Sequence, residues 1–185
     1  MRKSFGAKPF MYPMPVLIIA TYDENGVANA MNAAWGSAAD INRIAIYVSA
    51  GHKTMKNILA GSDFTVSMAT AATAIAADYV GIVSGNKVEN KIEKCAWHCT
   101  KSEKVNAPLI DELPMALECR MVSYDTESEL LIGEIVDVVA DESVITDGSI
   151  DPRKLDPICY DPVNHDYLRL GEKVANAFED GKKLI

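Results

Sequence analysis

The chain has 185 residues, of which 49% are hydrophobic, and a formal net charge of −8. This length and composition suit one domain with a sizeable core over residues 1–185. An acidic chain without a basic stripe is a poor nucleic-acid binder, and no uncharged apolar run reaches the roughly 18 residues of a membrane span. Because no apolar stretch follows the basic N-terminus, we expect a cytoplasmic protein that uses neither nucleic acid nor a membrane.

The N-terminal region predicts an extended arm followed by a hairpin. Residues 1–14 contain two prolines and an apolar cluster, which is typical of an arm that covers a partner or a sheet edge. The apolar, β-branched run Val16–Tyr22 predicts a strand, and Asn25-Gly26 is a strong hairpin signal. The chain should therefore return antiparallel over residues 27–35.

The composition of this returning strand is unusual for a core. Asn29 and Asn32 lie among alanine and methionine, where valine or isoleucine is expected. Small side chains let a flat ligand approach the backbone, and each carboxamide offers a donor and an acceptor. A heteroaromatic ring with alternating donors and acceptors on its edge would suit such a strand. The alternative is a strand end whose asparagines lie in turns and whose alanines fill a tight core.

The next segment combines a helix start with positive charge. Residues 43–49 predict a third strand, and Thr54 is placed to cap a helix over residues 55–60 that ends at Gly61. The stretch from residue 41 to 62 contains no Asp or Glu but has four basic side chains. An anionic small molecule could bind there despite the acidic total.

The rest of the chain adds strands and short helices. Strands are predicted at 63–68, 115–124, 130–139, 144–146 and 158–160, and helices at 71–83, near Ile92 and at 172–178. Residues 86–114 are otherwise polar and irregular, and Gly133 predicts a bulge within its strand. Six or seven strands with hairpin signals argue for an antiparallel barrel, whereas neither a βαβ rhythm nor a Gly-x-Gly-x-x-Gly motif indicates a Rossmann domain.

Four cysteines, Cys95, Cys99, Cys119 and Cys159, are scattered through the chain. In a mid-sized chain this pattern is typical of reduced thiols. The Cys95-Ala-Trp-His-Cys99 segment matches neither Cys-x-x-Cys nor the haem-attachment motif, and a metal would need further ligands brought in by the fold. We therefore predict no metal site, and the role of Cys95 and Cys99 stays open.

A family resemblance is carried by a series of short segments in a fixed order. They are Pro13-Met-Pro15-Val16, the hairpin, Asn29–Trp35, Thr54-Met-Lys-Asn57, Phe64-Thr-Val66, Ser84-Gly85 with Lys91, Leu117-Glu-Cys119, Ile132-Gly-Glu134-Ile-Val and Tyr167-x-x-Leu-Gly171. Together these segments resemble the flavin reductase-like FMN-binding family, and they are most similar to its flavoredoxin branch. The resemblance implies a mainly β (α+β) fold, a split Greek-key antiparallel β-barrel with two to three flanking helices, and non-covalently bound FMN.

Residue chemistry and the resemblance together give a set of candidate cofactor-binding residues. The hydroxyl of Thr54 and the free N–H groups at the start of its helix suit the phosphate, and the strand over residues 29–35 suits the ring. Taken alone, Thr54 could be a plain cap and Trp35 a core residue. The predicted residues are Asn29, Met31, Asn32, Ala34, Trp35, Ser49, His52, Lys53, Thr54, Asn57, Ser84, Gly85 and Lys91, with Lys87 a less secure choice than Lys91.

No Ser-His-Asp set or carboxylate pair is evident, so we assign no catalytic residue, which fits a protein whose flavin carries the chemistry. The resemblance implies an oxidoreductase in which NAD(P)H reduces bound FMN or free flavin. The alternative is a flavoredoxin-type electron-transfer protein that passes electrons between protein partners without NAD(P)H turnover. A third possibility is a barrel that binds haem or pyridoxal phosphate. We also expect a homodimer with FMN at or near the subunit interface, because a small barrel has no interior space for a flavin ring.

Overall fold

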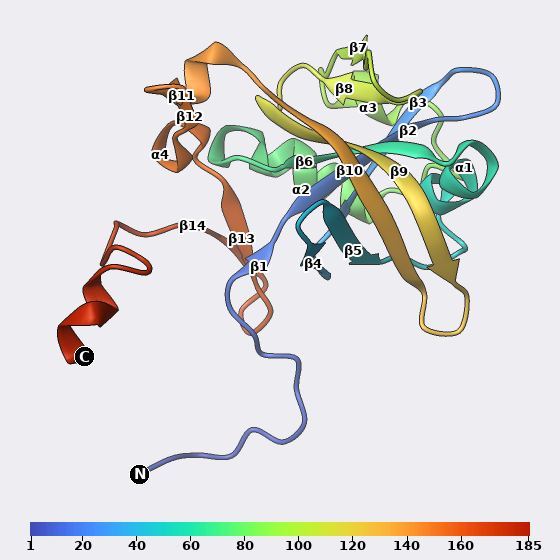
Figure 1. The fold of residues 1–185 in the computed structure, drawn as a ribbon. Coiled ribbons are helices and arrows are strands. Elements are labelled where there is room, and N and C mark those ends of the chain that lie inside the picture. The colour runs from blue at the N-terminus through green and yellow to red at the C-terminus, as the bar shows by residue number, and fades with distance from the viewer.

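The computed structural model describes residues 1–185, and its main feature is one curled antiparallel sheet of seven strands (Figure 1). The strands are arranged in the order β3-β2-β6-β9-β10-β5-β4. Their bounds are β2 Leu17–Tyr22, β3 Ala28–Ala33, β4 Gly36–Asp40, β5 Arg43–Tyr47, β6 Asp63–Met68, β9 Met115–Asp125 and β10 Leu130–Ala140. The predicted mainly β, antiparallel class is therefore confirmed.

Smaller elements surround this sheet. Three short sheets pair β1 (Met14–Pro15), β13 (Ile158–Asp161) and β14 (Asp166–Arg169); β7 (Cys99–Lys101) and β8 (Pro108–Ile110); and β11 (Ile145–Thr146) and β12 (Ser149–Ile150). The helices are α1 Lys53–Gly61, α2 Ala74–Ile82, α3 Lys91–Lys94 and α4 Pro152–Leu155, with 3-10 turns η1 Ala71–Thr73, η2 Glu142–Val144 and η3 Asp180–Leu184. No helix is long and apolar enough to cross a membrane.

The predicted opening hairpin is confirmed. Strands β2 and β3 pair antiparallel, with Ile18 opposite Asn32 and Thr21 opposite Asn29. The turn is closed by the carboxylate of Asp23, which accepts hydrogen bonds from two backbone N–H groups across it. Gly26 supplies the positive φ of 76° that this turn requires. Register then places both asparagines on the edge strand of the large sheet.

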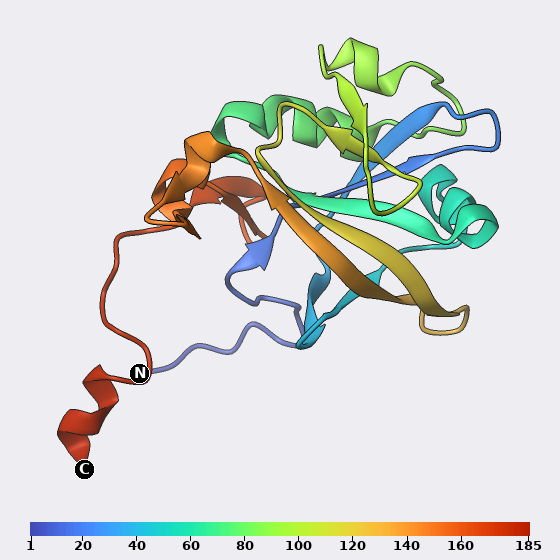
Figure 2. The same ribbon diagram turned by 45° about the horizontal axis from the view of Figure 1, so that its top comes forward.

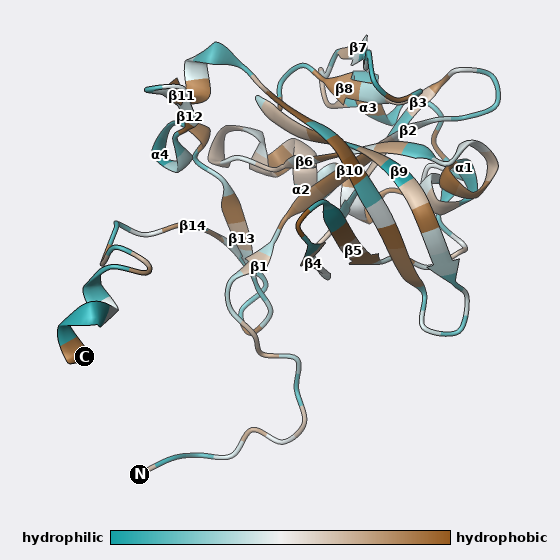
Figure 3. Ribbon diagram, in the orientation of Figure 1, coloured by the Kyte–Doolittle hydropathy of each residue, from teal (hydrophilic) through white to brown (hydrophobic).

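The sheet buries apolar side chains on both faces. The concave face encloses one cluster with Phe64 and Ile46 at its centre, and α1 closes it. The opposite face of β2 and β3 carries a second cluster, which α2, α3 and the β7–β8 pair cover. Figure 3 shows the corresponding hydrophobic segments along β5, β10 and β13, while the β2–β3 turn is hydrophilic. Both faces of β3 are therefore fixed by packing.

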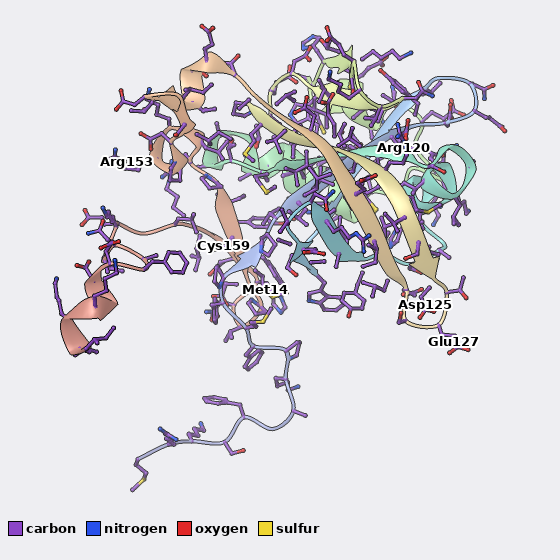
Figure 4. The ribbon with its side chains drawn as sticks, in the orientation of Figure 1. Met14, Arg120, Asp125, Glu127, Arg153 and Cys159 are labelled. Atoms are coloured by element: carbon purple, nitrogen blue, oxygen red, sulfur yellow. The ribbon has the colours of Figure 1, made fainter.

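Strands β9 and β10 form a long twisted hairpin, and Asp125 and Glu127 mark its tip (Figure 4). The pairing register shifts between Ile132 and Gly133, which confirms the bulge predicted there. A side chain at Gly133 would overlap the ring of Phe64 in the core beneath. The bulge thus lets the hairpin bend over the core without a gap.

Three predicted elements differ from the structure. The strand that follows the hairpin turn ends at Ala33, and a second strand, β4, begins at Gly36. The sequence did not predict β4, because its Gly-Ser-Ala-Ala residues have little strand propensity of their own. Residues 86–114 are less irregular than predicted, since they include β7 and β8. The helix predicted over 172–178 is wrong: this segment is not helical and packs on no other element that could stabilise a helix.

The N-terminal arm is tied to the body where β1 meets β13. Figure 4 labels Met14 and Cys159 on these two strands, whose register sets Met14 opposite Tyr160 and Pro15 opposite Cys159. Just before it, the Tyr12 hydroxyl donates to the carboxylate of Asp161, which also accepts from Asn164. These bonds lower the pKa of Asp161 to about 2, with the Tyr12 bond as the largest cause. Asp161 is buried, so the arm is attached through a charged group that has little contact with water.

Removing the Tyr12 hydroxyl should make this attachment more sensitive to acid. Because the folded pKa of Asp161 lies below its usual value, its stabilising contribution is present above pH 3.8 and is lost as the pH falls toward 2. Tyr12→Phe should raise the pKa of Asp161, move acid unfolding to higher pH and expose the arm to proteolysis. Tyr22→Phe is the control, since the Tyr22 hydroxyl has no hydrogen-bond partner. Equal acid midpoints for the two variants would contradict the prediction.

Candidate functional site

Two adjoining hollows lie where β3, the end of α2 and the start of α1 meet. The first, the polar hollow, has a volume of about 370 Å³ and is lined by Asn29, Met31, Ser49, Gly51, His52, Lys53, Thr54, Val80, Gly81, Ile82, Val83, Ser84, Gly85 and Lys91. The second, the aromatic hollow, has a volume of about 510 Å³ and is lined by Met31, Asn32, Ala33, Ala34, Trp35, Tyr47, Val48, Ser49, His52, Gly81, Ser128, Glu129 and Tyr160. The two hollows form one continuous groove, because they share the residues Met31, Ser49, His52 and Gly81.

The N-terminus of α1 opens onto the polar hollow. The helix begins at Lys53, with His52 as the N-cap, so the predicted cap at Thr54 is wrong by two positions. The cap makes no side-chain hydrogen bond, and the first turn contains no acidic residue. Its first N–H groups therefore lack intrahelical partners and remain available to an anion, which the helix dipole also favours.

Thr54 belongs to the wall of the hollow and is almost fully buried. Its Oγ1 accepts a hydrogen bond of 2.7 Å from Nδ2 of Asn29 on the facing strand. This bond fixes the carboxamide so that its oxygen is turned away from the threonine. The asparagine and the helix start are thus held in one arrangement, although they lie 25 residues apart in sequence.

Lys91 is a buried cation in the same wall, with an exposed fraction of only 3%. Its Nζ donates to the carbonyl oxygens of Ala30 and Val80, each at 2.8 Å. One acceptor lies on the edge strand β3 and the other in the last turn of α2, where helix carbonyls lack partners. Burial lowers the pKa of Lys91 to about 8. No carboxylate pairs with this ammonium, whereas Lys53 nearby forms an ion pair of 3.3 Å with Asp23.

Two glycines allow the end of α2 to approach β3 closely. A Cβ on Gly81 would overlap the carboxamide of Asn32, and one on Gly85 would overlap that of Asn29. Asn32 in turn donates from Nδ2 to the carbonyl of Ala77 at 2.9 Å. The strand and the helix are therefore joined by carboxamides that occupy the space of the missing glycine side chains.

The loop after α2 and the turn between β9 and β10 complete the rim. Asn86 donates to the carbonyl of Gly51 at 3.0 Å and accepts from Lys56 at 3.1 Å, which joins the loop to the start of α1. On the other side, the N–H of Val48 donates to the carbonyl of Glu129. The groove is thus bounded by five separate segments of the chain, within residues 29–35, 47–54, 80–91 and 128–129 and at Tyr160.

The structure brings together all but one of the thirteen predicted cofactor-binding residues. Asn57 lies in neither hollow; it is buried and donates from Nδ2 to Thr21 at 2.9 Å. Trp35 is 59% exposed on the rim, so it is not a core residue. Lys87, the less secure choice, lines neither hollow.

Sequence reasoning missed the residues that approach from distant segments. They are Gly51, Val80 to Val83, Ala33, Tyr47, Val48, Ser128, Glu129 and Tyr160. Gly81 had a detectable signal, because a glycine near the end of an Ala-rich helix suggests close backbone approach. The β9–β10 turn and Tyr160 had none, since only the closure of the sheet brings them to the groove.

Residues 10–158 match the flavin reductase like domain. The chain belongs to the flavin reductase-like family. A comparison with curated protein sequences gave no match.

Solved structures place the chain within this family. Flavoredoxin of Desulfovibrio vulgaris (Miyazaki F) is 35% identical and superimposes with a TM-score of 0.94, over 98% of this chain and 100% of that one. Flavoredoxin from Methanosarcina acetivorans is 28% identical, with a TM-score of 0.90 over 100% of both chains. An FMN-binding domain of a flavin reductase-like enzyme from Shewanella baltica shares the fold at 20% identity, with a TM-score of 0.79 over 88% of both chains. The predicted split-barrel fold and the flavoredoxin branch are thereby confirmed.

The residues in the groove fit the chemical parts of FMN. The unpaired ammonium of Lys91 and the open start of α1 are suited to a phosphate. Hydroxyls of Ser49 and Ser84 line the same hollow, where a ribityl chain needs hydrogen-bonding groups. The aromatic hollow is more apolar, and its small alanines leave room for a flat ring. The groups that line the groove thus change from cationic through hydroxyl-bearing to apolar, in the same order as the phosphate, ribityl chain and ring of FMN.

The four cysteines are free thiols. Burial raises the pKa of Cys99 to about 11 and that of Cys119 to about 12. Both thiols therefore stay protonated near neutral pH, and they are poor nucleophiles.

Proposed function

We propose that this chain binds one FMN non-covalently in the groove, with the phosphate at the start of α1 and the ring in the aromatic hollow. The observation that carries the proposal is the continuous groove itself. Its polar end contains the buried ammonium of Lys91, which has no carboxylate partner, and its other end is apolar. Denaturation should release free FMN into the supernatant. Flavin that stays with the precipitate, or protein that cannot be loaded with FMN, would refute it.

When bound, FMN supplies the hydride and electron transfer. The chain's own residues bind and orient it. Asn29, held by Thr54, presents a fixed carboxamide beside the polar hollow, and Asn32 is fixed in the same way by Ala77. Ala33 and Ala34 leave the edge of β3 open to a flat ring. No side chain is required to act as an acid or a base in this arrangement.

We further propose that the protein is an oxidoreductase in which NAD(P)H reduces bound FMN or free flavin. The second candidate is electron transfer between protein partners without NAD(P)H turnover, and the 35% identity to a flavoredoxin favours it. The excess of acidic over basic residues in 101–185 would suit a basic protein partner. NAD(P)H consumption under air by the purified, flavin-loaded protein decides between the two: turnover supports the reductase, and its absence supports electron transfer.

The same proposal includes a homodimer. Trp35 and Tyr47, 59% and 53% exposed, form an open wall of the aromatic hollow, so a ring lying there in one chain would remain partly in water. A second subunit would cover both the wall and the ring. Size-exclusion chromatography with light scattering should give the mass of two chains. The mass of one chain, with FMN fully bound, would refute the dimer.

Substitution of Thr54 tests where the phosphate lies. Thr54→Val keeps the shape of the side chain but removes a hydroxyl that lines the polar hollow, so FMN affinity should fall roughly ten- to a hundred-fold. Riboflavin, which lacks the phosphate, should bind the variant and the wild type about equally, and Thr54→Ser should keep FMN affinity. If riboflavin were lost as severely as FMN, Thr54 would act only by holding Asn29.

A further inference from the structure

The polar hollow has two walls that a single side chain ties together beside the start of α1. One wall is residues 51–54, and the other is residues 84–85 of the loop after α2. Asn86, the next residue of this loop, reaches across to α1. Its Nδ2 donates to the carbonyl of Gly51 at 3.0 Å, and its Oδ1 accepts from Nζ of Lys56, in the first turn of the helix, at 3.1 Å. These two hydrogen bonds form the Asn86 bridge.

The walls also touch each other at Gly85. A Cβ added there would meet Cβ of Lys53 at 3.2 Å and would overlap the carboxamide of Asn29. The ammonium of Lys53 pairs with Asp23 at 3.3 Å, in the turn between β2 and β3. Figure 2 shows this turn, in blue, and α1, in teal, at the same end of the molecule. The first turn of α1 is therefore held by two other segments, through Lys53 and through the Asn86 bridge.

The loop that carries Asn86 has a defined shape of its own. The carbonyl of Ser84 accepts hydrogen bonds from the backbone N–H groups of Lys87 and Val88, and the hydroxyl of Ser84 accepts one from the N–H of Asn86 at 3.3 Å. These bonds close a turn around Asn86. The bridge thus extends from a backbone that is already fixed, and it is the part of this wall that spans the gap to α1.

We infer that Asn86 determines which flavin the groove accepts, because its bridge closes the phosphate end to any ligand that continues beyond a phosphate monoester. This rests on the proposed function, which places the phosphate at the start of α1. FMN ends at this phosphate, whereas in FAD a pyrophosphate bond joins it to an adenylate. To admit FAD, the loop would have to give up both hydrogen bonds of the bridge. Discrimination of this kind comes from a cost imposed on the wrong ligand, without any added contact to the right one.

The test compares the affinities of FMN, FAD and riboflavin for the full-length, flavin-free protein by titration calorimetry. The wild type should bind FMN at least about ten-fold more tightly than FAD. Asn86→Ala removes both hydrogen bonds of the bridge, so FAD affinity should rise about ten-fold while FMN affinity changes by less than about three-fold. Both bonds are exposed, and the variant should therefore keep a thermal unfolding close to that of the wild type.

Asn90→Ala is the matched control. Asn90 is an exposed asparagine before α3 whose side chain makes no capping hydrogen bond, so this variant should keep the wild-type preference for FMN. Equal affinity of the wild type for FMN and FAD would overturn the inference, as would a preference that Asn86→Ala leaves unchanged, and FMN binding itself would still support the proposed function. A wild type that binds none of the three flavins would refute the proposed function and the inference together.

Discussion

Gly81→Ala should lower both the stability of the fold and its affinity for flavin. The new methyl group would overlap the carboxamide of Asn32, so either Asn32 gives up its bond to Ala77 or α2 moves away from β3. Overpacking of this kind costs about 1–3 kcal/mol in the free energy of unfolding. Gly81 lines both hollows, so flavin affinity should also fall by at least about ten-fold, or 1.4 kcal/mol. Chemical denaturation and flavin titration measure the two effects.

The control is a glycine without neighbours. Gly61→Ala, at the end of α1, places its Cβ where no other atom lies within 4 Å. It should leave flavin affinity unchanged and be neutral or slightly stabilising. Adding Asn32→Ala to Gly81→Ala removes the carboxamide that the methyl overlaps, and it should restore part of the lost stability. If the double variant were less stable than Gly81→Ala by the full effect of Asn32→Ala, the overlap would not be the cause.

The second large effect is a dependence of stability on pH that arises from Lys91. Its pKa of about 8 in the folded chain lies below the usual 10.5, because the ammonium is buried. Between these values the unfolded chain binds more protons than the folded one, so the stability of the wild type should rise with pH. A shift of this size corresponds to about 3 kcal/mol. Below pH 8 the penalty of burying the charge is fully present.

Lys91→Met isolates this contribution. Methionine has no charge, so the variant should lack the rise, and the free energy of unfolding of the wild type should increase by about 3 kcal/mol relative to that of the variant from below pH 8 to above 10.5. The measurement is denaturant unfolding of flavin-free protein across this range. In Lys87→Met, which changes an exposed lysine in the loop before α3, the free energy of unfolding should vary with pH as it does in the wild type. A constant difference between Lys91→Met and wild type would show that the ammonium is not desolvated.

Binding of FMN should interact with the same group. A phosphate in the polar hollow would favour the ammonium and raise its pKa, so loading at about pH 8.5 should take up protons in the wild type and not in Lys91→Met. Riboflavin should cause less uptake because it lacks the phosphate.

Local patterns predicted most strands because they carry their own signals. The Asn25-Gly26 turn and the bulge at Gly133 depend on residues close together in sequence. Strand β4 and the 172–178 segment were mispredicted, since the first gains its structure from pairing with β5 and the second has no surface to pack on. Local propensity cannot report either influence.

The candidate site was predictable in part for the same reason. Residues on β3 and at the start of α1 are unusual for their local context, and the structure brings them together. Asn57 is also an unusual residue for a helix interior, but its carboxamide donates a hydrogen bond to Thr21 and does not reach the groove. Tyr160 and the β9–β10 turn reach the groove only through the long-range order of the sheets. Sequence therefore indicated the chemistry of the groove better than its full outline.

The interlocking of Asn32 with Gly81, and of Asn29 with Gly85, bears on how such chains can diverge. Neither carboxamide can become larger unless the helix end moves, and neither glycine can gain a side chain unless the facing asparagine becomes smaller. A single mutation at any of the four positions meets a steric barrier that a paired mutation avoids. Among descendants of this sequence, positions 29 and 85 should therefore change together, as should 32 and 81, and intermediates with only one change should be rare.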